Sequence, residues 1–167
     1  EEEREMCGIV GYIGKRDAQD VLLGGLRRLE YRGYDSAGIV TISDTKKATL
    51  LRAKGKVSEL GKRVVAHEND DSIGIGHTRW ATHGEPSKVN THPHKAGDIY
   101  LVHNGIIENY KELKADLKNH TFVSKTDSEV LAALVDSFYT EETTLIDAVS
   151  KALKKAVGTY GVAVVST

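Results

Sequence analysis

The sequence predicts a layered α+β domain, because short apolar runs typical of strands alternate with longer segments that have helical periodicity. Some predicted strands follow one another across a short turn, as in a hairpin, whereas others are separated by helices. This mixture is typical of a fold built from layers of sheet and helix. With 167 residues, the chain has the length of one domain or of part of one.

Strands are predicted wherever an apolar run is bounded by turn-forming residues. In chain order they are expected over residues 8–13, 36–42, 48–53, 73–78, 99–103 and 160–165. The strands over 36–42 and 48–53 flank the turn-like sequence Ser-Asp-Thr-Lys, which predicts a hairpin. The strand over 99–103 is expected to stop at Asn104-Gly105, a dipeptide typical of turns.

Helices are predicted where apolar residues recur at intervals of three and four. The first covers residues 17–29, with one face made of Val21, Leu22, Leu26 and Leu29. Two shorter helices are marked by Val57, Leu60 and Val64, and by Tyr110, Leu113 and Leu117. The last two cover residues 126–138 and 143–157. A loop over 79–97 contains both prolines and few aliphatic residues.

The two ends of the chain do not fit a complete domain. The last predicted strand is apolar and is followed by nothing that could pair with it, and an exposed apolar edge is a liability that complete domains manage. We therefore expect the domain to be truncated at its C-terminus. The first five residues, Glu-Glu-Glu-Arg-Glu, indicate a solvated tail, a cloning remnant or a propeptide. Residues 1–6 are thus expected to be an extension that ends in the initiator methionine, and residues 7–167 to be the domain.

Composition excludes several classes of function. The 23 basic and 24 acidic residues give a net charge of −1, which implies no general attraction to nucleic acid or to an anionic membrane. No apolar run is long enough to span a bilayer, and no signal-peptide pattern is present. The single cysteine excludes an intrachain disulfide and is typical of a reducing compartment. The expected location is the cytoplasm.

Cys7 is the first candidate for chemistry, because it follows the only methionine of the chain. If Met6 and the residues before it were removed, Cys7 would carry both a thiol and a free α-amine. An α-amine has a pKa of about 7.7–8.0, so it can act as a general base near neutral pH. An N-terminal nucleophile activated by its own amine is an established form of covalent catalysis. The competing interpretation is an inert cysteine at the start of a strand.

The loop after the strand over 73–78 supplies further candidates, since catalytic and binding groups concentrate in loops at strand ends. Arg79 offers a planar set of donors that suits a carboxylate, although a surface arginine is the simpler reading of this residue alone. Trp80, the only tryptophan, is poorly explained as a core residue in a polar loop. A lid or a partner contact fits it at least as well.

Two polar segments in the second half of the chain have both structural and functional readings. Asn104-Gly105 is either a turn or an oxyanion hole made from the Asn104 side-chain amide and the Gly105 N–H. Thr126 and Glu129 are spaced as a helix-capping box, with Asp127 in the favourable first turn. Asp127 could also face a substrate ammonium, and the two readings of this residue are compatible.

Five of the seven histidines lie between His77 and His103, which suggests a metal site. No second cysteine is present, and no carboxylate stands at a familiar zinc-ligand spacing. Pro93 also restricts the orientation of the histidines on either side of it. A hydrogen-bonded loop is the better interpretation, and we expect neither a metal nor another cofactor.

Several of these segments, taken together, resemble the N-terminal-nucleophile (class II) glutamine amidotransferases. Within that superfamily they are similar to the glutaminase domain of the glutamine–fructose-6-phosphate aminotransferase family, which makes glucosamine 6-phosphate. The segments that carry the resemblance occur in order along the chain: MCGIVG at 6–11, LEYRGYDSAG at 29–38, HTRWATHGEPS at 77–87, NTHPH at 90–94, VHNGIIENY at 102–110 and TDSE at 126–129.

The resemblance implies a role for each matching residue. Cys7 would attack the side-chain amide of L-glutamine, and Asn104 with Gly105 would hold the oxyanion. Arg79 would pair with the α-carboxylate of glutamine and Asp127 with its α-ammonium. The glutamine pocket would also be lined by Thr82 and His83, and the route by which ammonia leaves would be gated by Trp80. Arg32 matches a motif residue of the family, but its role is not defined by the sequence.

The fold that the resemblance implies is the four-layer αββα sandwich of the N-terminal-nucleophile (Ntn) hydrolases, incomplete here at the C-terminus. The family continues into two sugar-isomerase domains, and fructose 6-phosphate would be a partner only through those domains. The full-length protein is expected to be a homo-oligomer.

Two other functions remain open from the sequence. The chain could be a catalytically silent module that only binds glutamine or a partner, because the amine of Cys7 is in a peptide bond and the sandwich is incomplete. It could also be a metal-dependent hydrolase built on the histidines. A glutaminase assay with mass spectrometry of the N-terminus tests the first, and a chelator tests the second.

Overall fold

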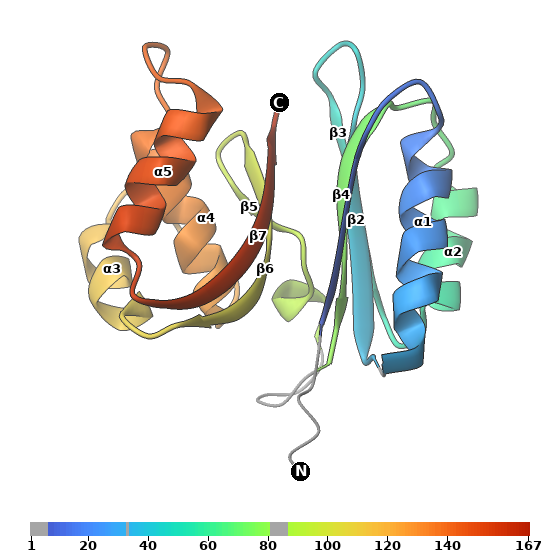
Figure 1. The fold of residues 1–167 in the computed structure, drawn as a ribbon, viewed down its shortest axis with the longest axis horizontal. Helices are drawn as coiled ribbons and strands as arrows, with labels where there is room; N and C mark the ends of the chain where they lie inside the picture. Colours follow the sequence, from blue (N-terminus) through green and yellow to red (C-terminus); the bar gives the residue numbers. More distant parts are fainter. Residues whose placement is uncertain (1–6, 33, 81–86) are drawn as a thin grey trace. The chain divides into compact units, whose positions relative to one another are not determined.

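The computed structural model describes residues 7–32, 34–80 and 87–167. They divide after Pro93 into two compact units, the second of which covers residues 94–166. Each unit is a sheet with helices packed against it (Figure 1). In the part of the chain that the structure describes, every helix is too short or too polar to cross a membrane.

The first unit contains an antiparallel four-stranded sheet with the order β1-β4-β2-β3. Its elements are β1 (Gly8–Ile13), α1 (Ala18–Leu29), the 3-10 turn η1 (Glu30–Arg32), β2 (Ser36–Ile42), β3 (Ala48–Lys54), α2 (Val57–Val65), β4 (Ile73–Arg79) and η2 (Lys88–Asn90). Helices α1 and α2 lie on the same face of this sheet (Figure 1). The predicted hairpin over 36–53 is confirmed. The strands predicted over 8–13 and 36–42 begin and end at the same residues as β1 and β2.

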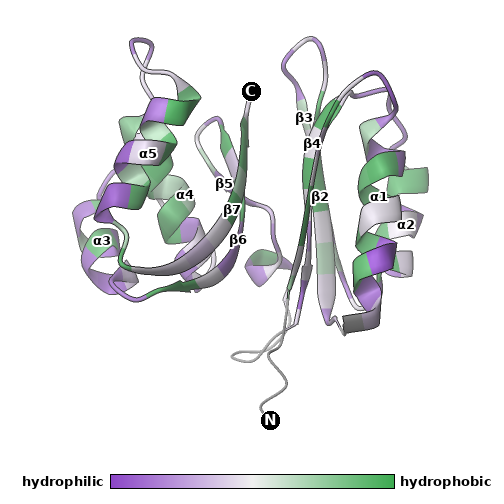
Figure 2. Ribbon diagram, viewed as in Figure 1, coloured by the Kyte–Doolittle hydropathy of each residue, from purple (hydrophilic) through white to green (hydrophobic). Residues whose placement is uncertain are grey.

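The core of the first unit lies between these helices and the sheet. Leu22 and Leu26 of α1 and Leu60 of α2 are fully buried against Ile39 of β2. Figure 2 shows hydrophobic segments in α1 and in the strands of this sheet, alternating with hydrophilic ones. Asp17 begins α1, because its carboxylate accepts hydrogen bonds from the N–H groups of the first helical turn.

The second unit contains a three-stranded antiparallel sheet with the order β5-β6-β7. Its elements are β5 (His94–Ala96), β6 (Ile99–Ile107), α3 (Tyr110–Asp116), α4 (Asp127–Phe138), α5 (Leu145–Lys155) and β7 (Gly158–Ser166). Helix α4 packs against β5, β6 and α5, and every residue from Ser128 to Val135 is buried. This helix is therefore the centre of the core of the second unit.

Two sequence-based boundaries in this part of the chain are wrong. The segment over 79–97 is not all loop, because it contains η2 and the short strand β5. Strand β6 does not stop at His103 but continues through Asn104 and Gly105 to Ile107. Those two residues pair with Gly161 and Tyr160 of β7, so pairing with a long partner strand overrides the local preference for a turn.

Candidate active site

The pairing of β1 with β4 places Cys7 beside Arg79 and Trp80. Gly8 lies opposite Thr78 in the sheet, and its N–H donates to Thr78 Oγ1 at 3.2 Å. One residue further, the N–H of Trp80 donates to Cys7 Sγ at 3.5 Å, and the thiol makes a long contact of 4.0 Å with the Trp80 carbonyl oxygen. Residues separated by more than seventy positions thus meet at one end of the sheet.

The surroundings of Cys7 disfavour its thiolate form. Burial raises the pKa of the Cys7 thiol, and the carboxylate of Asp35 raises it further. The backbone hydrogen bond from Trp80 and the positive charge of Arg79 act in the opposite direction, but the resulting pKa stays above the ordinary value. Because the thiolate is the nucleophilic form of cysteine, a reaction at this sulfur near neutral pH needs a base that removes the proton.

Arg79 is held against the turn that precedes the second unit. Its Nη1 donates to the carbonyl oxygen of Asn90 at 3.4 Å. The turn is closed within itself, since Ser87 Oγ accepts from the Asn90 N–H at 3.3 Å and Thr91 Oγ1 donates to the Ser87 carbonyl oxygen at 2.8 Å. The predicted loop residues Thr82 and His83 lie outside the described residues, whereas Trp80 is described and is 40% exposed.

A row of three residues across the sheet holds the segment after this turn. Arg52, Gly38 and His77 are neighbours on β3, β2 and β4. Arg52 Nη1 donates to the Thr91 carbonyl oxygen at 3.3 Å, and the His77 ring stacks on the ring of His92 with the centroids 4.0 Å apart. A Cβ atom at Gly38 would lie 1.9 Å from the His92 carbonyl oxygen, so this close approach requires glycine.

In the second unit, Gly105 has a backbone that only glycine adopts without strain. Its φ angle is +119°, and a Cβ atom there would lie 2.1 Å from the carbonyl oxygen of Thr159 on β7. The preceding residue, Asn104, is partly buried. The backbone conformation of β6 at position 105 therefore requires a residue without a side chain.

Asp127 connects the first turn of α4 to β6. Its Oδ2 accepts a hydrogen bond from the Ile107 N–H at 2.8 Å. The other carboxylate oxygen, Oδ1, takes no part in this hydrogen bond. The predicted capping box is half correct, because Thr126 Oγ1 accepts from the Glu129 N–H at 3.2 Å, whereas Glu129 does not reach back to the Thr126 N–H. Thr126 Oγ1 also lies 3.0 Å from His94 Nε2.

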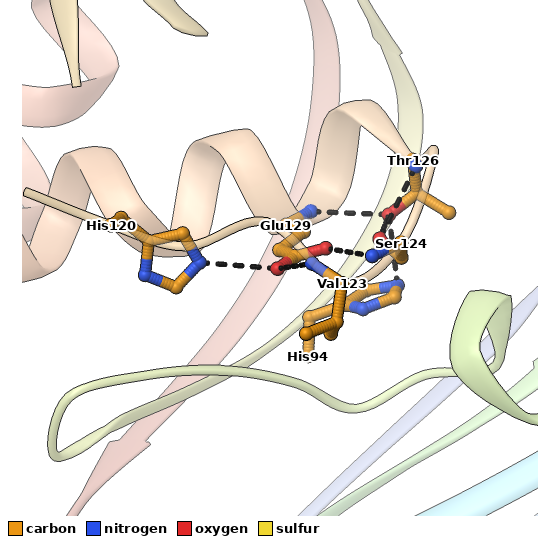
Figure 3. A network of polar contacts seen from close by, with 6 residues as sticks. All are labelled: His94, His120, Val123, Ser124, Thr126 and Glu129. Atoms are coloured by element: carbon orange, nitrogen blue, oxygen red, sulfur yellow. Dashed lines mark hydrogen bonds and ion pairs between the residues drawn. The ribbon is translucent and has the colours of Figure 1, made fainter. Parts of the chain in front are cut away.

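The carboxylate of Glu129 instead organises the segment before the helix (Figure 3). It accepts from the N–H groups of Val123 and Ser124 at 2.9 and 2.7 Å and lies 3.1 Å from His120 Nε2. Burial alone would raise the pKa of Glu129, but the hydrogen bonds from Ser124, Val123 and His120 together hold it below the ordinary value.

His103 is a buried residue that the sequence placed in the histidine cluster and in a family motif but to which it assigned no role of its own. Its Nδ1 lies 2.8 Å from Ser128 Oγ, and both residues are 3% exposed. Burial lowers the pKa of His103, although the Asp127 charge and a hydrogen bond with the Thr159 backbone oppose the shift. The available signal was a polar residue that ends the apolar run over 99–102, directly before Asn104.

The four histidines of this region that the structure describes have contacts other than metal ligation. His77 stacks on His92, and hydrogen bonds join His94 to Thr126 and His103 to Ser128. Among the residues that the structure describes, no group of three or more His, Cys, Asp or Glu side chains is arranged to hold a metal ion.

The candidate residues thus form one group in each unit. Cys7, Arg79 and Trp80 come together in the first unit. In the second unit, Asp127 is hydrogen-bonded to β6, the strand that carries Asn104 and Gly105.

The chain belongs to a known class of protein domain. Residues 37–164 match the family described as "Glutamine amidotransferase domain", and the chain belongs to this family. It is similar to the N-terminal region of glutamine–fructose-6-phosphate aminotransferase [isomerizing]. Identity is 50% over 161 residues with the Vibrio cholerae enzyme and 50% over 164 residues with the Escherichia coli K12 enzyme. These matches cover 95% and 97% of the chain but only 26% and 27% of the relatives.

Solved structures agree with this assignment. The glutamine phosphoribosylpyrophosphate amidotransferase from B. subtilis superposes with a TM-score of 0.79 at 28% identity, over 96% of this chain and 35% of that one. A class-II glutamine aminotransferase domain protein from Silicibacter pomeroyi shares the fold, with a TM-score of 0.63 at 19% identity over 96% of this chain and 73% of that one. The predicted α+β class and the Ntn-type amidotransferase fold are confirmed.

Proposed function

We propose that this chain is the glutamine-hydrolysing part of a glutamine–fructose-6-phosphate aminotransferase. The observation that carries the proposal is the Cys7 thiol held beside Arg79 and Trp80 in a chain of the glutamine amidotransferase family. The 50% identity to enzymes of that name supports this particular member of the family.

The proposed reaction begins with L-glutamine held by its two charges. Arg79 pairs with the α-carboxylate and Asp127 with the α-ammonium, while Thr82 and His83 line the pocket. Binding both charged groups of glutamine fixes the position of its side-chain amide near the nucleophile, and this proximity lowers the barrier to hydrolysis. An arginine fork suits a carboxylate, and Asp127 is held in place by its hydrogen bond from Ile107.

Cys7 Sγ then attacks the amide carbon, and the α-amine of Cys7 takes the thiol proton. Asn104 and Gly105 stabilise the tetrahedral oxyanion through a side-chain amide and a backbone N–H. Collapse of this intermediate breaks the C–N bond, and the amine passes the proton to the departing ammonia. Water hydrolyses the resulting γ-glutamyl thioester to glutamate and regenerates the thiol.

The mechanism needs a free amine on Cys7, so residues 1–6 have to be removed before the enzyme is active. The raised pKa of the thiol makes this requirement stronger, since little thiolate forms near neutral pH without a base. A free α-amine has a pKa of about 7.7–8.0, which suits the role of base and then acid.

The rest of the proposal concerns the longer protein. Ammonia would leave past Trp80 to convert fructose 6-phosphate to glucosamine 6-phosphate in the part of the relatives that this chain does not span. We place that protein in the cytoplasm as a homo-oligomer.

The test is a glutaminase assay on the chain after removal of residues 1–6, with the exposed N-terminus verified by intact mass. We expect release of glutamate, and we expect Cys7→Ala to abolish hydrolysis while glutamine still binds. Asn104→Ala should lower kcat about 10²–10³-fold with a smaller change in binding.

Two outcomes would contradict the proposal. Substantial turnover by Cys7→Ala would exclude this residue as the nucleophile. Failure of the trimmed chain to release glutamate would instead favour a silent glutamine-binding module. The chain with residues 1–6 attached is the matched control, because it keeps every side chain and lacks only the free amine.

A further inference from the structure

We propose that His103 and Ser128 are a positioning pair that sets the geometry of Asn104 and Gly105. The inference rests on the proposed function, because it assigns these two residues to the oxyanion hole of the hydrolytic reaction. It concerns a hydrogen bond between β6 and α4 within the second unit.

The segment that carries Asn104 and Gly105 is tied to the first turn of α4 on both sides. Before it, His103 Nδ1 lies 2.8 Å from Ser128 Oγ. After it, the Ile107 N–H donates to Asp127 Oδ2 at 2.8 Å. Two consecutive residues of the helix thus hold two points of the strand, and the proposed oxyanion donors lie between those points.

The pair is well suited to fix a backbone position. Both side chains are 3% exposed, so water does not compete for their hydrogen bond. Ser128 lies in a helix whose buried residues form the core of the unit, which gives His103 a rigid partner. His103 is the neighbour of Asn104 along the chain, so a shift of its side chain moves the Asn104 backbone.

Strand β6 has an unusual backbone at this point. Gly105 has a φ angle of +119° and lies against the Thr159 carbonyl oxygen of β7. Pairing with β7 continues through Asn104 and Gly105 on one edge of the strand, and the hydrogen bonds of His103 and Ile107 to the first turn of α4 hold the same segment to the helix.

A positioning role and a purely structural role have different kinetic consequences. An oxyanion hole acts in the transition state, so displacement of its donors lowers kcat and leaves the binding of glutamine nearly unchanged. General loosening of the fold lowers the melting temperature and affects KM as well. The ratio of the two effects separates the roles.

The experiment uses the chain that begins at Cys7 and compares Ser128→Ala with Ser137→Ala. Both remove a hydroxyl from α4, but Ser137 Oγ only donates to the Leu134 carbonyl oxygen within the helix. We expect Ser128→Ala to lower kcat for glutamine hydrolysis about tenfold with KM changed less than twofold, because one supporting hydrogen bond of the donors is lost. Ser137→Ala should keep the parent kcat.

A double-mutant cycle tests whether the two residues act as a unit. His103→Ala and Ser128→Ala should each lower kcat, and the double variant should be no slower than the slower single variant. His103→Asn retains an amide that can reach Ser128, so its kcat should lie between those of the parent and His103→Ala. If Ser128→Ala does not fold, the comparison of His103→Asn with His103→Ala at unchanged KM provides the test.

The inference is overturned if Ser128→Ala matches Ser137→Ala in kcat, if the two single losses multiply in the double variant, or if KM rises as much as kcat falls. Cys7→Ala is measured in parallel. If that variant is inactive while Ser128→Ala is unaffected, only the positioning pair is wrong. If Cys7→Ala retains turnover, the proposed function itself fails.

Discussion

At the scale of single residues, the reactivity of Cys7 follows from its burial. Burial is the largest influence on this thiol and raises its pKa, and the Trp80 backbone and Arg79 compensate only in part. The sulfur is therefore a poorer nucleophile near neutral pH than an exposed cysteine, for which the pKa is about 8.5. Activation has to come from a base in the reaction.

This property can be measured directly because Cys7 is the only cysteine of the chain. With residues 1–6 attached, we expect the rate of alkylation by iodoacetamide to rise with pH through a midpoint above that of the same chain in urea. The sign follows from the raised pKa, since the alkylated species is the thiolate and unfolding removes the burial that disfavours it. A folded-state midpoint at or below the value in urea would contradict the burial argument.

The sequence was informative about the residues that carry charge or nucleophilicity and less informative about the residues that support them. Cys7, Arg79 and Asp127 could be selected from their chemistry and neighbours. Gly38 and Arg52 could not, because their importance comes from the approach of residues 91 and 92 to the sheet, which is a tertiary contact. His103 had a weak signal as a polar residue in an apolar strand.

At the scale of elements, the start of α4 combines a helix cap with a buried carboxylate. Glu129 is 1% exposed and accepts two backbone hydrogen bonds from the segment that leads into the helix. It thereby fixes Val123 and Ser124 just ahead of the Asp127 turn (Figure 3). The helix start is thus determined by more than the Thr126 cap.

Glu129→Gln should lower the free energy of unfolding at pH 7 by about 1–3 kcal/mol, because an amide is a weaker acceptor and its NH₂ group meets N–H donors. Glu112→Gln on the exposed face of α3 is the matched control and should change it by less than about 0.5 kcal/mol. Urea denaturation measures both.

The pH dependence of this effect has a defined sign. The pKa of Glu129 is lowered in the folded chain, so its stabilising contribution is present above the ordinary glutamate pKa of about 4.3. The contribution is lost as the pH falls through the lowered folded-state value. The difference between the parent and Glu129→Gln should therefore shrink in acid, and a difference that grows as the pH falls would contradict this account.

Sequence periodicity located most helices and strands but not every boundary. The strands of the first unit were predicted well because apolar runs and turn residues agreed there. The Asn104-Gly105 boundary was wrong because the pairing of β6 with β7 depends on a strand more than fifty residues away. The predicted capping box was half right because the Glu129 carboxylate accepts hydrogen bonds from the N–H groups of Val123 and Ser124, in the loop before the helix, and not from the Thr126 N–H.

At the scale of the whole molecule, the predicted class and the family are confirmed by the comparisons, and the roles of the site residues remain proposals. The pattern of apolar runs, turn residues and helical periodicity gave only a layered α+β domain. Several motifs in a fixed order gave the family, because a single motif such as Asn-Gly has a common structural explanation. The chain spans about a quarter of the length of the aminotransferases that it matches.

This coverage leads to a prediction about coupling. The family match over residues 37–164 concerns a glutamine amidotransferase domain, and the matched aminotransferases continue well beyond it. The 167-residue chain, once trimmed to Cys7, should therefore release glutamate from glutamine but form no glucosamine 6-phosphate when fructose 6-phosphate is added. The glutamate rate should also be independent of the sugar phosphate, because Arg79 and Asp127 are proposed to recognise only the charges of glutamine. Mass spectrometry of the products would detect amino-sugar phosphate, and the full-length Vibrio cholerae enzyme is the positive control. Formation of glucosamine 6-phosphate by the trimmed chain would contradict the prediction that this chain only hydrolyses glutamine.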